Sequence, residues 1–186
     1  MLATLIAEDP SVASDVDDPE LALCERTDAA AARALTNYPR EGAAQFGVNI
    51  PHAYYGGFVA RVQGDSAKAK APFTVARSEV EKTVEKQPDF PAALSLLGMI
   101  DAGLGRKEEA IREGRRACEL LPISKDAVDG PVLAVNLAQI YAWTGEKDLA
   151  IEQIAAVERV PNPLSYGLLK LHPRFEKIVA DLAPKE

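Results

Sequence analysis

The sequence of 186 residues is poor in the residues that metal and disulfide chemistry require, with two cysteines and two histidines. Two cysteines are too few for a disulfide framework, and too few for a zinc site unless histidines contribute. His52 and His172 are far apart in the chain, each lies beside a proline, and neither belongs to an HExxH motif. We therefore expect no metal or cofactor, and we expect Cys24 and Cys118 to be small buried side chains.

Long apolar runs and clusters of basic residues are also missing. The longest apolar run is far too short for a bilayer span, and MLATLIA at residues 1–7 has no basic stretch or cleavage site of a signal peptide. A formal net charge of −7 opposes phosphate binding, which requires clustered Lys and Arg. We expect a cytoplasmic protein that binds neither nucleic acid nor membrane.

Alternating β-branched segments are absent, and helix-forming residues dominate from residue 17 onward, so we expect an all-α fold. Pro72 falls inside one predicted helix and should cause a kink or a late start there. The segment 40–51 contains Gly, Asn and Pro without a helical period, and we expect it to be a connection. The helices are expected at 19–26, 28–37, 52–64, 66–87, 91–105, 106–121, 131–145, 146–160 and 173–183.

A short stretch of sequence occurs twice, as GRKEEAI at 105–111 and as GEKDLAI at 145–151. Gly105 and Gly145 are suited to end a helix, because glycine readily adopts the left-handed conformation of a C-terminal cap. Ala110 and Ala150 are small enough to fit closely against the preceding helix. The echo predicts a repeated unit of helix, tight glycine turn and antiparallel helix.

These spacings resemble tetratricopeptide repeats, whose 34-residue unit has large and small residues at fixed positions. Asp101 and Gly114 depart from the pattern, and Asp101 takes a position that usually holds tyrosine. The matching residues are Gly57, Ala60, Ala69, Phe73 and Ala76 in 50–83, Leu94, Leu97, Gly98, Ala110, Ala117 and Pro122 in 91–124, and Leu137, Ala138, Tyr141, Ala150 and Val157 in 131–164.

The resemblance implies one domain over 1–186, a right-handed α-solenoid of antiparallel helix hairpins with a C-terminal capping helix. Its parts would be an abbreviated hairpin at 17–39, repeats at 50–87, 91–122 and 131–160, and the capping helix at 173–183. The glycine echo spans forty residues, six more than the repeat, and we place the surplus in the link ISKDAVDG. The extra residues between Gly64 and Gly105 should instead lengthen a helix. We therefore expect uneven stacking of the first hairpin on the second and of the second on the third.

Three segments, 102–131, 137–154 and 163–175, resemble more narrowly the C-terminal repeat region of large bacterial signalling proteins. In that family the repeats follow a serine/threonine kinase, a nucleotide cyclase or a winged-helix DNA-binding domain. None of these parts is in the sequence, so the resemblance implies a fragment or a trimmed homologue.

The first helix of each tetratricopeptide hairpin lines a concave groove, and the resemblance assigns eight residues to it. A single arginine among them opposes a carboxylate clamp, whereas the aromatic and apolar side chains suit an amphipathic helix or an extended apolar segment. Two alternatives stay open, since these side chains could pack within the domain or the helix at 174–182 could lie in the groove. The eight residues are Tyr54, Phe58, Arg61, Ser95, Met99, Val135, Gln139 and Trp143.

No constellation of residues indicates catalysis. GLGRKE at 103–108 lacks the phosphate-loop pattern and lies between two predicted helices instead of after a strand. Arg112, Arg115 and Arg116, with Arg106 and Lys107, could form a basic patch, but a Glu108–Arg112 pair on a solvated helix face explains the charges better. We expect a non-catalytic module that binds a protein or peptide. The alternative is a regulatory module that binds a small apolar ligand for an associated kinase or cyclase, and a closed apolar pocket would favour it.

Overall fold

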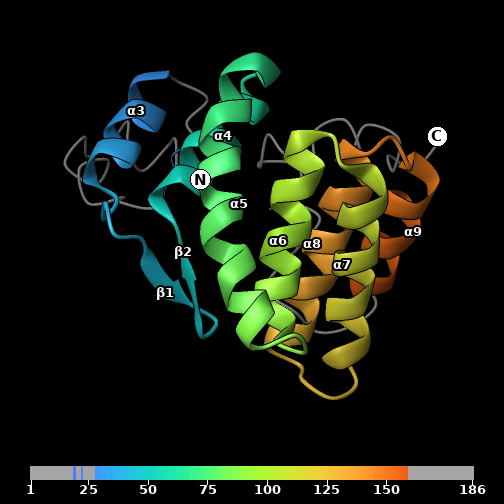
Figure 1. The fold of residues 1–186 in the computed structure, drawn as a ribbon. Helices are drawn as coiled ribbons and strands as arrows, with labels where there is room; N and C mark the ends of the chain where they lie inside the picture. Colours follow the sequence, from blue (N-terminus) through green and yellow to red (C-terminus); the bar gives the residue numbers. More distant parts are fainter. Residues whose placement is uncertain (1–18, 20–21, 23–27, 159–186) are drawn as a thin grey trace, which may run out of the picture.

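A computed structural model describes residues 19, 22 and 28–158 of the chain, and these residues are mostly helical, as predicted (Figure 1). The capping helix predicted at 173–183 lies outside the described residues, as does most of the helix predicted at 19–26. The described elements are α3 Asp28–Asn37, β1 Ala43–Gln45, β2 Val48–Ile50, α4 His52–Val62, α5 Ser66–Lys86, α6 Pro91–Leu104, α7 Lys107–Leu120, α8 Asp129–Trp143 and α9 Lys147–Glu158.

Three turns of one geometry join the helices in pairs, α4 with α5, α6 with α7 and α8 with α9. Each turn contains a glycine in the left-handed conformation, with φ of 88° at Gly64, 81° at Gly105 and 86° at Gly145. The residue after each glycine donates its N–H to the carbonyl five residues earlier, as in a Schellman motif. These bonds are Asp65 to Ala60 (2.9 Å), Arg106 to Asp101 (2.8 Å) and Glu146 to Tyr141 (2.8 Å). The echo in the sequence is therefore a repeated turn, and Gly64 is its third member.

The surplus residues lie where the sequence predicts them. Helix α5 has 21 residues and α7 has 14, so the extra length between Gly64 and Gly105 is in a helix. The next surplus lies in the link between α7 and α8, at residues 121–128. Pro72 is inside α5, which starts at Ser66, so the late start does not occur. The start of α5 is capped by the Asp65 carboxylate, which accepts the N–H of Lys68 at 2.8 Å.

A β-hairpin occupies residues 43–50, where the sequence predicted only a connection. Strands β1 and β2 are antiparallel, with Gln45 paired to Val48 next to the turn. Both turn residues have positive φ, 52° at Phe46 and 76° at Gly47, which is the conformation of a tight two-residue hairpin loop. Val48 and Ile50 are buried, so β2 joins the apolar core.

Consecutive helices from α4 to α9 pack side by side, and α6 additionally packs against both α4 and α8. Figure 1 shows α3 and the β-hairpin at one end of this row and α9 at the other. One apolar cluster is centred on α4, α5 and α6, and a second on α8 and α9. Ile111 of α7 packs against both clusters and links them. Within the described residues, no helix combines the length and apolar character that a membrane span needs.

Candidate functional site

Three of the predicted groove residues meet where α4 and α8 approach each other. The ring centres of Phe58 and Trp143 are 5.6 Å apart. The guanidinium carbon of Arg61 lies 5.7 Å from the centre of the Trp143 ring, within the range of a cation–π contact. Tyr54 extends the group, with its ring centre 5.6 Å from that of Phe58. An aromatic and cationic cluster therefore connects the first hairpin with the third.

Phe73 of α5 completes this cluster because two glycines leave space for its ring. The Phe73 ring centre lies 6.2 Å from that of Trp143. A methyl group on Gly57 of α4 would lie 2.7 Å from two ring atoms of Phe73, and one on Gly103 of α6 would lie closer still. Both distances are too short for real atoms, so glycine is required on each side. Phe73 is fully buried and fixes the positions of α4, α5 and α6 relative to each other.

Most of the predicted groove residues are buried in this structure. Arg61 and Trp143 are partly exposed. Tyr54 and Phe58 are covered because Phe73 enters from α5 and Trp143 reaches α4. The chain's own rings therefore occupy the space between these helices. The six buried residues are Tyr54, Phe58, Ser95, Met99, Val135 and Gln139.

The predicted residues on α6 and on the middle of α8 contribute to helix packing. The Nδ2 of Asn136 donates to the Oγ of Ser95 at 3.1 Å, which ties α8 to α6. Met99 belongs to the first apolar cluster and Val135 to the second. For these residues the alternative of packing within the domain describes the structure better than a groove lining.

The sequence did not indicate as a site the buried acidic group in the last turn of α6. Asp101 is fully buried, and its Oδ1 accepts from the Nε of Arg77 at 2.7 Å. Arg77 also donates to Glu81 at 2.8 Å, and the Nε of Arg106 is 3.6 Å from the Asp101 Oδ1. Burial lowers the pKa of Arg77, but the hydrogen bonds to both carboxylates outweigh it and leave that pKa raised. This network connects α5, α6 and the start of α7.

Glu113 of α7 lies beside this network and is itself buried. Burial raises its pKa from 4.5 to about 7, and the charge of Asp101 adds to the rise, as does the hydrogen bond that Glu113 can donate to Asp101 only when it is protonated. The charge of Arg112 acts in the opposite direction. The only signal of this pair in the sequence was an acid at a position that usually holds tyrosine. Asp101 of α6 and Glu113 of α7 together form an acidic pair between the two helices.

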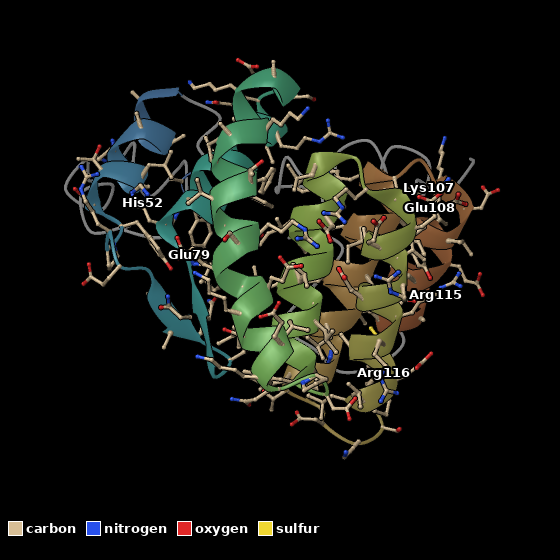
Figure 2. The ribbon with its side chains drawn as sticks, in the orientation of Figure 1. His52, Glu79, Lys107, Glu108, Arg115 and Arg116 are labelled. Atoms are coloured by element: carbon tan, nitrogen blue, oxygen red, sulfur yellow. The ribbon has the colours of Figure 1, made fainter. Side chains whose placement is uncertain are left out.

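The outer side of α7 carries the basic residues considered in the sequence, and Figure 2 shows Lys107, Arg115 and Arg116 along this helix. A hollow of about 690 Å³ runs along it, with Leu94 and Ile111 among its lining residues. Arg115 donates to the hydroxyl of Tyr141 at 2.8 Å. Arg116 donates to Asp89 at 2.7 Å, and Lys107 pairs with Glu146. These cations are already engaged by the protein, which argues against an anion site here.

Arg112 lies beside Glu113, with 3.5 Å between its Nη2 and the Glu113 Oε1. This contact takes the place of the Glu108–Arg112 pair expected from the sequence. Arg106, at the start of α7, donates to Glu109 at 2.9 Å. The charges of this helix therefore pair locally, although with different partners from those predicted.

The remaining candidates for chemistry are His52 and Cys118. His52 begins α4, is partly buried, and its Nε2 lies 2.9 Å from the carbonyl oxygen of Leu35. Burial raises the pKa of the Cys118 thiol to about 11, which keeps it protonated and unreactive. Among the described residues, no group of three or more potential ligands could hold a metal ion. Cys24 and His172 lie outside the described residues.

Comparison of the chain with protein-family models and with curated proteins found no match. The resemblance to tetratricopeptide repeats therefore rests on the spacing of large and small residues in the sequence alone.

Proposed function

We propose that this chain is a non-catalytic protein-interaction module, built as an α-solenoid of three tetratricopeptide-like hairpins. The observation that carries the proposal is the repeated turn at Gly64, Gly105 and Gly145, with the same hydrogen bond in each copy. The helix after each turn also contains a fully buried alanine in the same place, at Ala69, Ala110 and Ala150. Helical repeats of this kind create extended surfaces that bind other proteins.

The part of the inner face that we assign to the partner is the pair Arg61 and Trp143. Both side chains are partly exposed, and contacts with Phe58 and Phe73 hold the indole in place. Trp and Arg are enriched among the residues that dominate binding energy at protein interfaces. An indole that is already fixed loses little conformational entropy when a partner binds. The surface suits an apolar helix or extended segment that packs on the indole and carries an acidic group near Arg61.

The alternative function, binding of a small apolar ligand, receives less support from the inner face. Phe58, Phe73 and Trp143 fill the space between α4 and α8 with their own rings. A ligand would have to displace them, whereas a peptide could pack on the exposed part of the cluster. The resemblance to bacterial signalling proteins favours a signalling protein as the partner.

Charge reversal at Arg61 tests the proposal. Arg61→Glu should abolish capture of partner proteins from an extract of the source cells, because it removes the cation beside Trp143 and repels an acidic partner. Arg40→Glu is the matched control, since Arg40 is exposed and lies in the segment before β1. Wild type and Arg40→Glu should capture the same proteins. Equal capture by all three chains would refute binding at this face, provided that circular dichroism shows all three folded.

A further inference from the structure

Two buried carboxyl oxygens, one on α6 and one on α7, have no hydrogen-bond partner among the described residues: Oδ2 of Asp101 and Oε2 of Glu113. Asp101 is fully buried and Glu113 is 8% exposed. A buried oxygen without a donor destabilises the folded state, and more so if it is charged. Two such oxygens on neighbouring helices therefore require an explanation.

The charged groups around the acidic pair do not supply the missing donors. From α5, Arg77 binds the other oxygen of Asp101 and also pairs with Glu81. Arg106 is nearest to that same Oδ1, and its better hydrogen bond is with Glu109. From α7, Arg112 approaches the Oε1 of Glu113 at 3.5 Å. All the arginines near the pair thus contact its other oxygens or other acids.

Helix α8 meets α7 through apolar atoms near this position. A methyl group on Gly114 would lie 2.7 Å from the Cδ1 of Ile140 and 3.0 Å from the Cδ1 of Leu137. A methyl group on Gly98 of α6 would likewise lie 2.9 Å from the Cδ1 of Ile140. Ile140 and Leu137 of α8 therefore pack closely against the backbone of α6 and α7 at these two glycines.

We propose that Glu113 carries a proton and donates it in a hydrogen bond to the unpaired oxygen of Asp101, and that this shared proton clamps α6 to α7. A protonated carboxyl group donates one O–H, so a single proton on Glu113 turns two unpaired oxygens into a donor and an acceptor. Two carboxylates that share a buried site cannot both remain ionised without strong repulsion. The Asp101 Oδ1 stays bound to Arg77, which favours Glu113 as the residue that carries the proton.

Solvent can deliver this proton through the hollow on α7. Glu113 is one of the residues that line it, together with Arg112 and Ile111. The pair can therefore exchange its proton with bulk water without unfolding of the hairpin.

The clamp predicts that the folded state becomes less stable as pH rises. Burial and Asp101 raise the pKa of Glu113 to about 7 in the folded protein, above the 4.5 that is usual for the unfolded chain. The folded state therefore holds the proton more tightly than the unfolded state. Stabilisation by the clamp is complete below pH 4.5 and is lost progressively as pH rises toward 7. The unfolding equilibrium constant should increase by roughly tenfold or more between pH 5 and pH 7 from this pair.

Carboxyl-carbon NMR titration of the wild-type protein tests the proton site directly. The Glu113 signal is assigned by its loss in Glu113→Gln, and its midpoint should lie within about one pH unit of 7. A midpoint in the usual range of an exposed glutamate, about 4–5, would overturn the proposal. This measurement does not depend on the stability of any variant, because the titration itself uses the unaltered chain.

Denaturant unfolding at several pH values tests the clamp. Glu113→Gln keeps a hydrogen-bond donor but cannot titrate, so its stability should change less than that of the wild type between pH 5 and pH 7. Glu119→Gln is the matched control, because Glu119 is exposed on the same helix. The control should keep the wild-type pH dependence. Equal pH dependence in all three proteins would show that the shared proton does not hold α6 to α7.

Discussion

Gly56 and Gly57 are neighbours on α4, and the structure predicts opposite effects for the same substitution at the two positions. A methyl group on Gly57 would lie 2.7 Å from the Cγ and Cδ1 of Phe73. The ring cannot move away, because Gly103 leaves it no spare space on the other side. A methyl group on Gly56 would lie 3.6 Å from the Cβ of Pro72, which is an ordinary contact.

The magnitudes follow from two effects. Replacing glycine by alanine inside a helix stabilises it by about 1 kcal/mol, because the unfolded chain loses conformational freedom. Overpacking a rigid core typically costs about 1–3 kcal/mol, and the fixed Phe73 ring places Gly57→Ala at the upper end. Gly56→Ala should therefore stabilise the protein by about 0.5–1 kcal/mol, whereas Gly57→Ala should destabilise it by about 1–2 kcal/mol.

Urea unfolding followed by tryptophan fluorescence measures both variants, because Trp143 is the single tryptophan of the chain and belongs to the Phe73 cluster. Adding Phe73→Leu to each variant gives a double-mutant cycle. The smaller side chain should recover part of the stability lost in Gly57→Ala and should not help Gly56→Ala. If Gly57→Ala is as stable as Gly56→Ala, the Phe73 ring does not exclude a side chain at position 57.

Three further variants probe the turns and the polar network. Asp65→Ala removes the cap on the N–H of Lys68 and should cost about 1 kcal/mol in urea unfolding, whereas no loss would show that the cap contributes nothing. Gly105→Ala meets no described atom within 4 Å, so its expected cost of about 1 kcal/mol measures the left-handed backbone alone. A stability equal to wild type would contradict that conformation. Asp101→Asn should lower the pKa of Glu113, because the neighbouring negative charge is removed, and an unchanged titration midpoint would contradict their coupling.

The helical hairpins could be predicted because their signals are local. A glycine at the end of a helix is sufficient to indicate such a turn, because glycine readily adopts the left-handed conformation of the cap. Gly105 and Gly145 have the left-handed conformation expected from the sequence. Counting residues between the glycines also placed the surplus correctly, in α5 and in the link before α8. Neither result required knowledge of tertiary contacts.

The β-hairpin at 43–50 could not be predicted because its turn lacks the usual signal. A two-residue hairpin loop with positive φ at both positions favours Asn-Gly or Asp-Gly, and this one is Phe46-Gly47. Each strand has only three residues, which is too short for an alternating pattern to stand out. Burial of Val48 and Ile50 stabilises the hairpin through the core.

The candidate site was only partly predictable for a different reason. Repeat positions assign Phe58, Arg61 and Trp143 to one groove, and Phe58 and Arg61 both contact Trp143, but repeat positions do not indicate how far the space around them is filled. Phe73 enters from the second helix of a hairpin through spaces left by two glycines, which depends on contacts distant in sequence. The bond between Arg77 and Asp101 also joins residues 24 positions apart in the sequence. The helical pattern alone gives no sign of it, because charged residues are expected on the solvent-exposed side of a helix.

Site-specific photocrosslinking tests the proposed interaction surface most directly. A photoreactive phenylalanine analogue in place of Ser66, which is exposed and accepts a hydrogen bond from Arg61, leaves Arg61 and Trp143 in place, and the same analogue in place of Arg40 serves as the control. Irradiation of cells that express each protein should link position 66, and not position 40, to a defined partner protein. Crosslinks of equal yield at both positions, or none at position 66 in a folded protein, would contradict partner binding at this face.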